Sequence, residues 1–152
     1  MLAVNVVALT VLTHALLPAM IQKKRGAILN VSSSAGFLPV KKLAVYAATK
    51  AFVTSFSEAL RAEVQRSGIA VTSLCPGPVH TEFGHVARRN SSKPERSGPE
   101  FVHVSVEETV RAGLKAIERG KPIVVPGLII KIAMLLVRVT PMPLLRLASR
   151  LS

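Results

Sequence analysis

Tyr46 and Lys50 lie four positions apart and could act as a proton-transfer pair. Residues with this spacing share one face of a helix, so the phenol and the ammonium can act together. A free phenol has a pKa of about 10, and a neighbouring cation favours its ionised form. Tyr46 is the only tyrosine in the chain. A tyrosine and a lysine one helical turn apart are ordinary, so only the surrounding residues can give this pair meaning.

Three serines offer hydroxyl groups next to the expected end of a strand. The preceding run, residues 27–31, is apolar nearly throughout, which is typical of a strand buried on both faces of a parallel sheet. Open parallel sheets bind ligands at the carboxyl ends of their strands. Ser33 could hydrogen-bond a substrate oxygen there, and Ser32 and Ser34 compete with it for this role.

The histidines and the single cysteine do not form a recognisable catalytic or metal-binding set. Their spacing is not that of metal ligands, and nucleophilic catalysis through a histidine needs an acidic partner that orients the ring. The following side chains therefore receive no catalytic role, and we expect no metal site: His14, His80, His85, His103 and Cys75.

The elements that must position these residues alternate between helix and strand. Apolar residues recur every three or four positions in the expected helices, and short apolar or β-branched runs mark the expected strands. The expected elements are a helix over residues 2–21, a strand over 27–31, a helix over 43–66, a strand over 69–74, a helix over 105–118 and a strand over 122–125. This order predicts an α/β fold with a parallel sheet.

The segments outside these elements predict one domain with a distinct carboxyl-terminal part. Residues 75–78 end the second strand in a proline-containing turn. Residues 78–100 mix glycine, proline and charged side chains, so we interpret them as a surface loop that contacts the substrate. Residues 127–152 predict apolar and basic helices after a core of residues 1–126.

Composition narrows the classes of partner. The chain has 152 residues, 49% of them hydrophobic, and a net charge of +12. Its basic residues are scattered with little aromatic interleaving, which argues against nucleic-acid binding. One cysteine cannot form an internal disulfide, so a reducing, cytoplasmic setting is the simplest interpretation. The basic amphipathic tail at residues 144–151 allows contact with a membrane surface.

Three motifs occur in the order found in one enzyme family. NVSSSAG at residues 30–36, YAATK at 46–50 and PGPVHT at 76–81 resemble the short-chain dehydrogenase/reductase family. The resemblance implies a Rossmann-like, doubly wound parallel sheet. In that family the catalytic serine stands three residues before the loop glycine and thirteen before the tyrosine, which selects Ser33.

The same resemblance implies roles for further residues. Tyr46 would be the general acid/base, while Lys50 would lower its pKa and hold the nicotinamide ribose. Asn5 matches the asparagine that completes a proton relay with the lysine in this family. The turn that would hold the nicotinamide carboxamide is matched by Pro76, Gly77, Val79 and Thr81.

The family's amino-terminal dinucleotide-binding half has no counterpart here. No glycine-rich turn between a strand and a helix is present, so only the nicotinamide end of NAD or NADP can be placed. The first helix has no capping residue before it, which suggests that the native structure extends upstream. The strand at residues 27–31 would then lack a sheet neighbour, and we expect poor solubility.

These observations predict an NAD(P)-dependent oxidoreductase that interconverts an alcohol and a ketone or aldehyde. We expect a small, hydrophobic substrate. The family also commonly pairs through the helices that correspond to residues 2–21 and 43–66, which implies a homo-oligomer for a complete enzyme. The alternative is an inactive, truncated relative that acts as an interaction protein or binds a membrane surface.

Overall fold

A three-stranded parallel sheet forms the centre of the molecule, as the order of helices and strands predicts. The computed structural model describes residues 1–79 and 103–151. The strands lie in the order β1 (Gly26–Val31), β2 (Ile69–Leu74) and β3 (Ile123–Val124), and both neighbouring pairs are parallel. The helices are α1 (Leu9–Gln22), α2 (Ala44–Val64), α4 (Val106–Glu118), α5 (Leu128–Val139) and α6 (Met142–Leu151).

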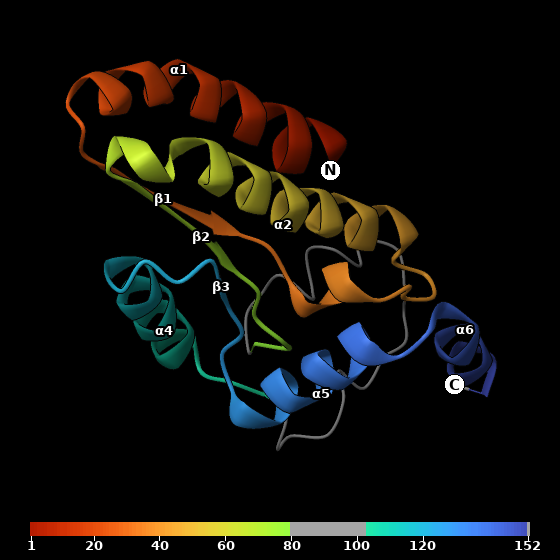
Figure 1. Cartoon of the computed structure of the whole chain (residues 1–152). Helices are drawn as coiled ribbons and strands as arrows, with labels where there is room; N and C mark the ends of the chain where they lie inside the picture. Colours follow the sequence, from red (N-terminus) through yellow and green to blue (C-terminus); the bar gives the residue numbers. More distant parts are fainter. Residues whose placement is uncertain (80–102, 152) are drawn as a thin grey trace.

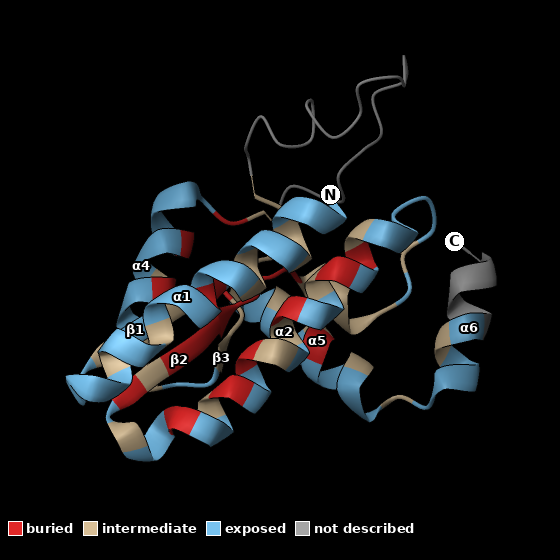
Figure 2. Ribbon diagram, turned by 90° about the horizontal axis from the view of Figure 1, so that it is seen from above, coloured by how far each residue is buried: buried red, intermediate tan, exposed pale blue. Residues whose placement is uncertain are grey.

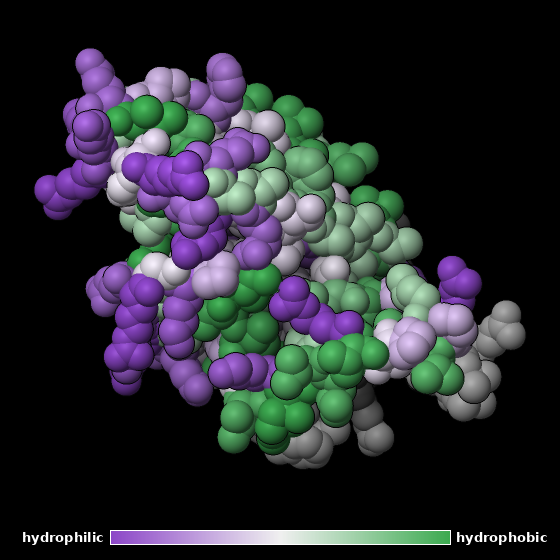
Figure 3. Space-filling model, in the orientation of Figure 1, coloured by the Kyte–Doolittle hydropathy of each residue, from purple (hydrophilic) through white to green (hydrophobic). Residues whose placement is uncertain are grey.

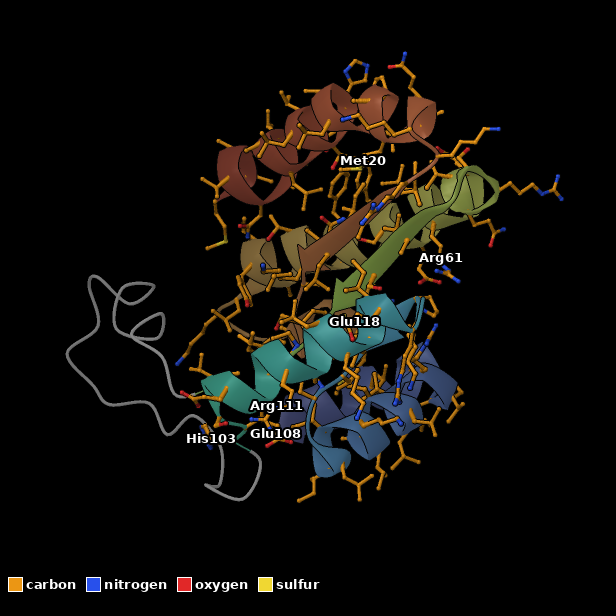
Figure 4. All side chains as sticks on the ribbon, turned by 90° about the vertical axis from the view of Figure 1, so that its left-hand side faces the viewer. Met20, Arg61, His103, Glu108, Arg111 and Glu118 are labelled. Carbon is orange, nitrogen blue, oxygen red and sulfur yellow. The ribbon has the colours of Figure 1, made fainter. Side chains whose placement is uncertain are left out.

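Helices cover both faces of this sheet. Helices α1 and α2 lie on one face and α4 on the other, while α5 lies near the carboxyl ends of the strands (Figure 1). The central strand β2 is almost fully buried, as the colouring in Figure 2 shows. Leu60 and Val64 from α2 form a core cluster with Ile69 and Val71 from β2. Met20 of α1 packs against this cluster from its position under the helix (Figure 4).

The ends of two helices follow from their local sequence. Helix α2 is followed by a 3-10 turn and by Gly68, which has a φ of +73° and therefore ends the helix in the left-handed region. Ser105 caps α4, because its side chain accepts a hydrogen bond of 3.1 Å from the Glu108 amide. This cap confirms the predicted start of the helix. Glu108, Arg111 and Glu118 lie along α4 (Figure 4).

Three elements differ in detail from the sequence prediction. The first helix begins as a π-helical segment, η1 (Ala3–Ala8), before it continues as α1. The expected polar turn contains a short 3-10 helix, η2 (Ser34–Phe37). Strand β3 has only two residues, because it pairs with β2 only opposite Ser73 and Leu74. Most of the expected substrate loop lies outside the described residues.

Strand β1 is an edge strand in the described part of the chain. It pairs with β2 along its whole length and with no other described strand. A groove of about 500 Å³ runs between this strand and the first helix, and its lining is largely apolar. Asn5 and Lys50 also contribute to its lining. The expectation that β1 lacks a second sheet neighbour therefore holds for the described residues.

Candidate active site

Tyr46 and Lys50 lie together on the first turns of α2. The Lys50 Nζ atom is 5.7 Å from the centre of the Tyr46 ring. The same ammonium donates a hydrogen bond of 2.9 Å to the carbonyl oxygen of Val31, the last residue of β1. Both side chains are half-buried. The predicted pair is therefore brought to the carboxyl end of a strand, where parallel sheets bind ligands.

Ser33 lies two residues after the end of β1 and caps the short helix η2. Its Oγ accepts a hydrogen bond of 3.2 Å from the Ala35 amide, and a hydroxyl that accepts in this way keeps its own hydrogen for a second partner. The loop packs closely on α2, because a Cβ atom added to Gly36 would lie 2.8 Å from the Ala51 nitrogen. Only glycine fits at this position without a shift of the backbone.

Ser32 differs from Ser33 in its hydrogen bonds. Its Oγ donates to the Lys50 carbonyl oxygen at 2.7 Å and lies 2.8 Å from the Thr54 hydroxyl oxygen. Thr54 also donates to the Lys50 carbonyl, at 3.2 Å. The Ser32 side chain is thus engaged in fixing the α2 backbone at Lys50. Between these two serines, the hydrogen bonds favour Ser33 over Ser32 for contact with a ligand.

Asn5 is held against α2 by a residue that the sequence analysis did not select. The Asn5 Nδ2 atom donates to the Thr49 hydroxyl at 3.0 Å, and that hydroxyl donates to the Tyr46 carbonyl at 2.8 Å. Thr49 is only 1% exposed. Asn5 also lies within the π-helical segment, a feature that is frequent at functional sites. No pattern of spacing in the sequence indicates this contact between distant residues.

The turn after β2 lies beside the serine loop. The Ser34 amide donates a hydrogen bond of 2.9 Å to the Pro76 carbonyl oxygen, so the two loops are directly joined. Gly77 lies under α5, because an added Cβ would be 2.8 Å from a side-chain carbon of Ile130. Val79 forms an isolated parallel bridge with Val104. Thr81 lies outside the described residues.

Burial changes the acid strength of one candidate residue. It lowers the pKa of the Lys50 ammonium below its ordinary value of 10.5, and the nearby Cys75 opposes that shift. Cys75 itself is fully buried. Among the described residues, no group of three histidine, cysteine or acidic side chains is arranged to hold a metal ion. The site that emerges consists of a phenol, an ammonium and hydroxyl groups.

These features define an α/β protein with a parallel sheet, in which a phenol, an ammonium and hydroxyl groups lie where such sheets bind ligands. A family model described as short chain dehydrogenase matches residues 1–92. The match covers more than half of the chain. The chain therefore belongs to the short-chain dehydrogenase family, whose members are NAD(P)-dependent oxidoreductases.

The chain is also similar to curated relatives that are named for one reaction. It is 37% identical over 123 residues to the very-long-chain 3-oxoacyl-CoA reductase of Bos taurus, covering 81% of this chain and 38% of the relative. A protein of the same name from Laccaria bicolor is 51% identical over 72 residues, which cover 47% of this chain and 21% of that protein. The chain thus spans less than two fifths of the length of these relatives.

Solved structures of the family resemble the fold. A short-chain dehydrogenase from Sphingobium yanoikuyae in complex with NADPH has a TM-score of 0.70 and 34% identity, covering 84% of this chain and 47% of that one. A short-chain dehydrogenase from Burkholderia cenocepacia in complex with NADP has a TM-score of 0.72 and 28% identity, covering 93% and 54% respectively. The fold prediction is confirmed by these likenesses.

Proposed function

We propose that this chain carries the catalytic residues of an NADP(H)-dependent reductase that acts on the ketone of a long, hydrophobic 3-oxoacyl thioester. The observation that supports the proposal is the position of Lys50, which lies beside Tyr46 and bonds to Val31 at the carboxyl end of β1, two residues before Ser33. The relatives named 3-oxoacyl-CoA reductases support the substrate class. The NADPH and NADP complexes of similar structures support the choice of cofactor.

The described residues fit the nicotinamide end of such a cofactor. Lys50 is half-buried and carries a donor suited to ribose hydroxyl groups, and it lies beside Tyr46. The joined loops at Ser34 and Pro76 place backbone groups next to these side chains. No glycine-rich dinucleotide turn occurs in the sequence, so the adenosine end finds no matching residues here.

The side chains would divide the work of reducing a carbonyl. The cofactor, when bound, supplies the hydride. Tyr46 holds a proton at its phenolic oxygen and transfers it to the substrate oxygen as negative charge develops there. Ser33 donates a hydrogen bond to that same oxygen, which stabilises the developing charge. Lys50 stabilises the phenolate that remains, and Asn5 keeps the start of the first helix against α2.

A substitution at Tyr46 tests this division of work. Tyr46→Phe removes the proton donor but keeps the aromatic ring, so we expect NADPH oxidation with a long-chain 3-oxoacyl-CoA to fall by roughly 10²–10⁴-fold. The cofactor affinity, followed by nicotinamide fluorescence, should change much less. Both measurements use the purified 152-residue chain, and absence of NADPH binding by the wild type would mean that the residues at the nicotinamide end do not hold the cofactor by themselves. Saturable NADPH binding with equal turnover by the wild type and the variant would contradict the assignment of Tyr46.

A further inference from the structure

Helix α5 presents an apolar face to solvent. Six of its residues are between 48% and 72% exposed, although all of them are large and hydrophobic. At ~100° per residue they cover about a third of the helix circumference. These residues, called the α5 outer face below, are Leu128, Ile129, Ile132, Leu135, Leu136 and Val139. Figure 3 shows apolar side chains gathered over this helix.

The opposite side of α5 is already seated on the protein. Ile130 lies against Gly77, and the Arg138 guanidinium lies 5.9 Å from the centre of the Phe37 ring. Met134 is buried. The inner face therefore accounts for the packing of this helix on the turn and on η2. A helix that is apolar on both sides needs a second apolar environment on its outer side.

The charges near the α5 outer face point to an anionic partner. No acidic residue occurs after Glu118, whereas the sequence from there onward contains six basic ones. Lys131 is exposed and lies on one flank of the outer face. A second copy of this chain would bring two such basic surfaces together without compensating acids. Anionic lipid headgroups would be attracted to the same surface.

The lengths of the two terminal helices determine how they would meet a bilayer. Helix α5 has 12 residues, about 18 Å, and α6 has 10 residues, about 15 Å, whereas a hydrocarbon core is ~30 Å thick. Pro141 and Pro143 separate α5 from the body of α6. Met142 and Leu144 at the start of α6 are also exposed. The two helices are thus suited to lie in the interface rather than to span it.

We propose that the α5 outer face and the start of α6 dock this protein onto the surface of an anionic lipid bilayer. The apolar side chains would enter the headgroup region while Lys131 and the other basic residues contact the lipid phosphates. Since the inner face of α5 packs on Gly77 and η2, the candidate active site would lie one helix away from the lipid. The docking itself does not depend on the proposed catalytic function.

The first helix is the competing location for lipid contact. Among the described residues, Ala3–Gln22 is the one helical stretch long and apolar enough to cross a membrane by length and composition, a test that core helices of soluble proteins also pass. This stretch is bound to the rest of the protein. Asn5 bonds to Thr49, and Leu17 and Met20 pack on the core cluster. Its outer side still carries exposed residues such as Val11, so an experiment must separate the two surfaces.

Vesicle co-sedimentation of the whole chain with two matched variants separates them. Leu135→Glu places a charge on the α5 outer face, and Val11→Glu places the same charge on α1; the replaced residues are 63% and 59% exposed. Vesicles contain phosphatidylcholine alone or with about one third phosphatidylserine. We expect the wild type to bind the anionic vesicles, with weaker binding at high salt. Leu135→Glu should weaken binding roughly tenfold, the loss of one buried leucine, and Val11→Glu should not.

The outcomes are exclusive. Circular dichroism should give the wild type and the two variants the same unfolding curve, since both replaced side chains are exposed. If Leu135→Glu is unstable, Lys131→Gln is used in its place. Lys131→Gln should lower binding to the anionic vesicles only. Binding that Val11→Glu abolishes and Leu135→Glu spares would overturn the proposal in favour of α1. Absence of binding by the wild type at low salt, or dissociation of a dimer by Leu135→Glu without any effect on vesicles, would also overturn it.

Discussion

At the residue scale, the site depends on side chains that fix the start of α2 as well as on those that could react. Thr49 joins Asn5 to the Tyr46 carbonyl, and Ser32 and Thr54 both engage the Lys50 carbonyl. A second set of hydroxyl groups thus holds the backbone that carries the proton-transfer pair. Positioning of this kind matters because proton transfer is sensitive to small displacements of the donor.

The first prediction concerns Thr49. Thr49→Val removes the hydroxyl that connects two distant segments and leaves the Asn5 amide without this partner. We expect the free energy of unfolding to fall by about 1–2 kcal/mol in urea titrations, because the variant loses the hydrogen bonds of the Thr49 hydroxyl to Asn5 and to the Tyr46 carbonyl. Thr49→Ser keeps the hydroxyl and serves as the control. Unchanged stability of Thr49→Val would contradict a stabilising role for these hydrogen bonds, whereas any loss in Thr49→Ser reports the packing of the methyl group that this variant removes.

A second prediction concerns the desolvated ammonium of Lys50. Its pKa is lower in the folded chain than the ordinary 10.5, so the unfolded chain binds more protons between the two values. The free energy of unfolding must therefore gain a positive slope with pH in this window. Comparison with Lys50→Met in urea titrations from neutral pH to about pH 11 isolates that slope. A variant that reproduces the wild-type slope would contradict the assignment to Lys50.

The residues of the site divide into those that sequence patterns could predict and those that they could not. Ser33, Tyr46 and Lys50 lie in short motifs, and the fold brings these motifs together at the end of β1. Thr49 and Asn5 are 44 positions apart, and their contact arises only when the first helix packs beside α2. The distinction between Ser32 and Ser33 likewise depends on which hydroxyl faces the α2 backbone.

At the element scale, the sequence predicted the ends of these helices and strands to within two residues. Gly68 and Ser105 act through their own backbone and side-chain geometry, so the sequence indicates them directly. The length of β3 depends on how far its partner β2 remains paired, which no local pattern specifies. The spacing of apolar residues also does not predict the π-helical start of the first helix, because the same spacing fits an α-helix equally well.

Two glycines after helices allow backbone strain to be separated from steric contact. Gly68 and Gly120 have similar positive φ values, 73° and 60°. An added Cβ at Gly68 would collide with the Lys24 carbonyl oxygen, whereas nothing lies within 4 Å at Gly120. Gly120→Ala should cost about 1–2 kcal/mol of unfolding free energy from the left-handed backbone alone. Gly68→Ala should cost clearly more in thermal or urea unfolding, and equal costs would show that the loop around Lys24 relaxes freely.

At the scale of the whole molecule, the edge of β1 that no other described strand pairs with is a structural weakness. An edge strand exposes a row of backbone hydrogen-bonding groups that can pair with another chain. Here that edge also borders an apolar groove of about 500 Å³. The chain spans less than two fifths of the length of its curated relatives. We expect low solubility of the 152-residue chain because of this exposed strand edge and the apolar groove beside it.

A charge placed on this strand should reduce association between molecules. Ala27 is exposed on β1, and a lysine there opposes edge-to-edge pairing, as charged residues do on natural edge strands. Ala62→Lys on α2 adds the same charge at an exposed position away from the edge. We expect light scattering of concentrated samples to decrease for Ala27→Lys and to stay near the wild-type level for Ala62→Lys. A similar decrease in both would assign the effect to net charge, since the chain already carries +12 and any added lysine increases the repulsion between molecules.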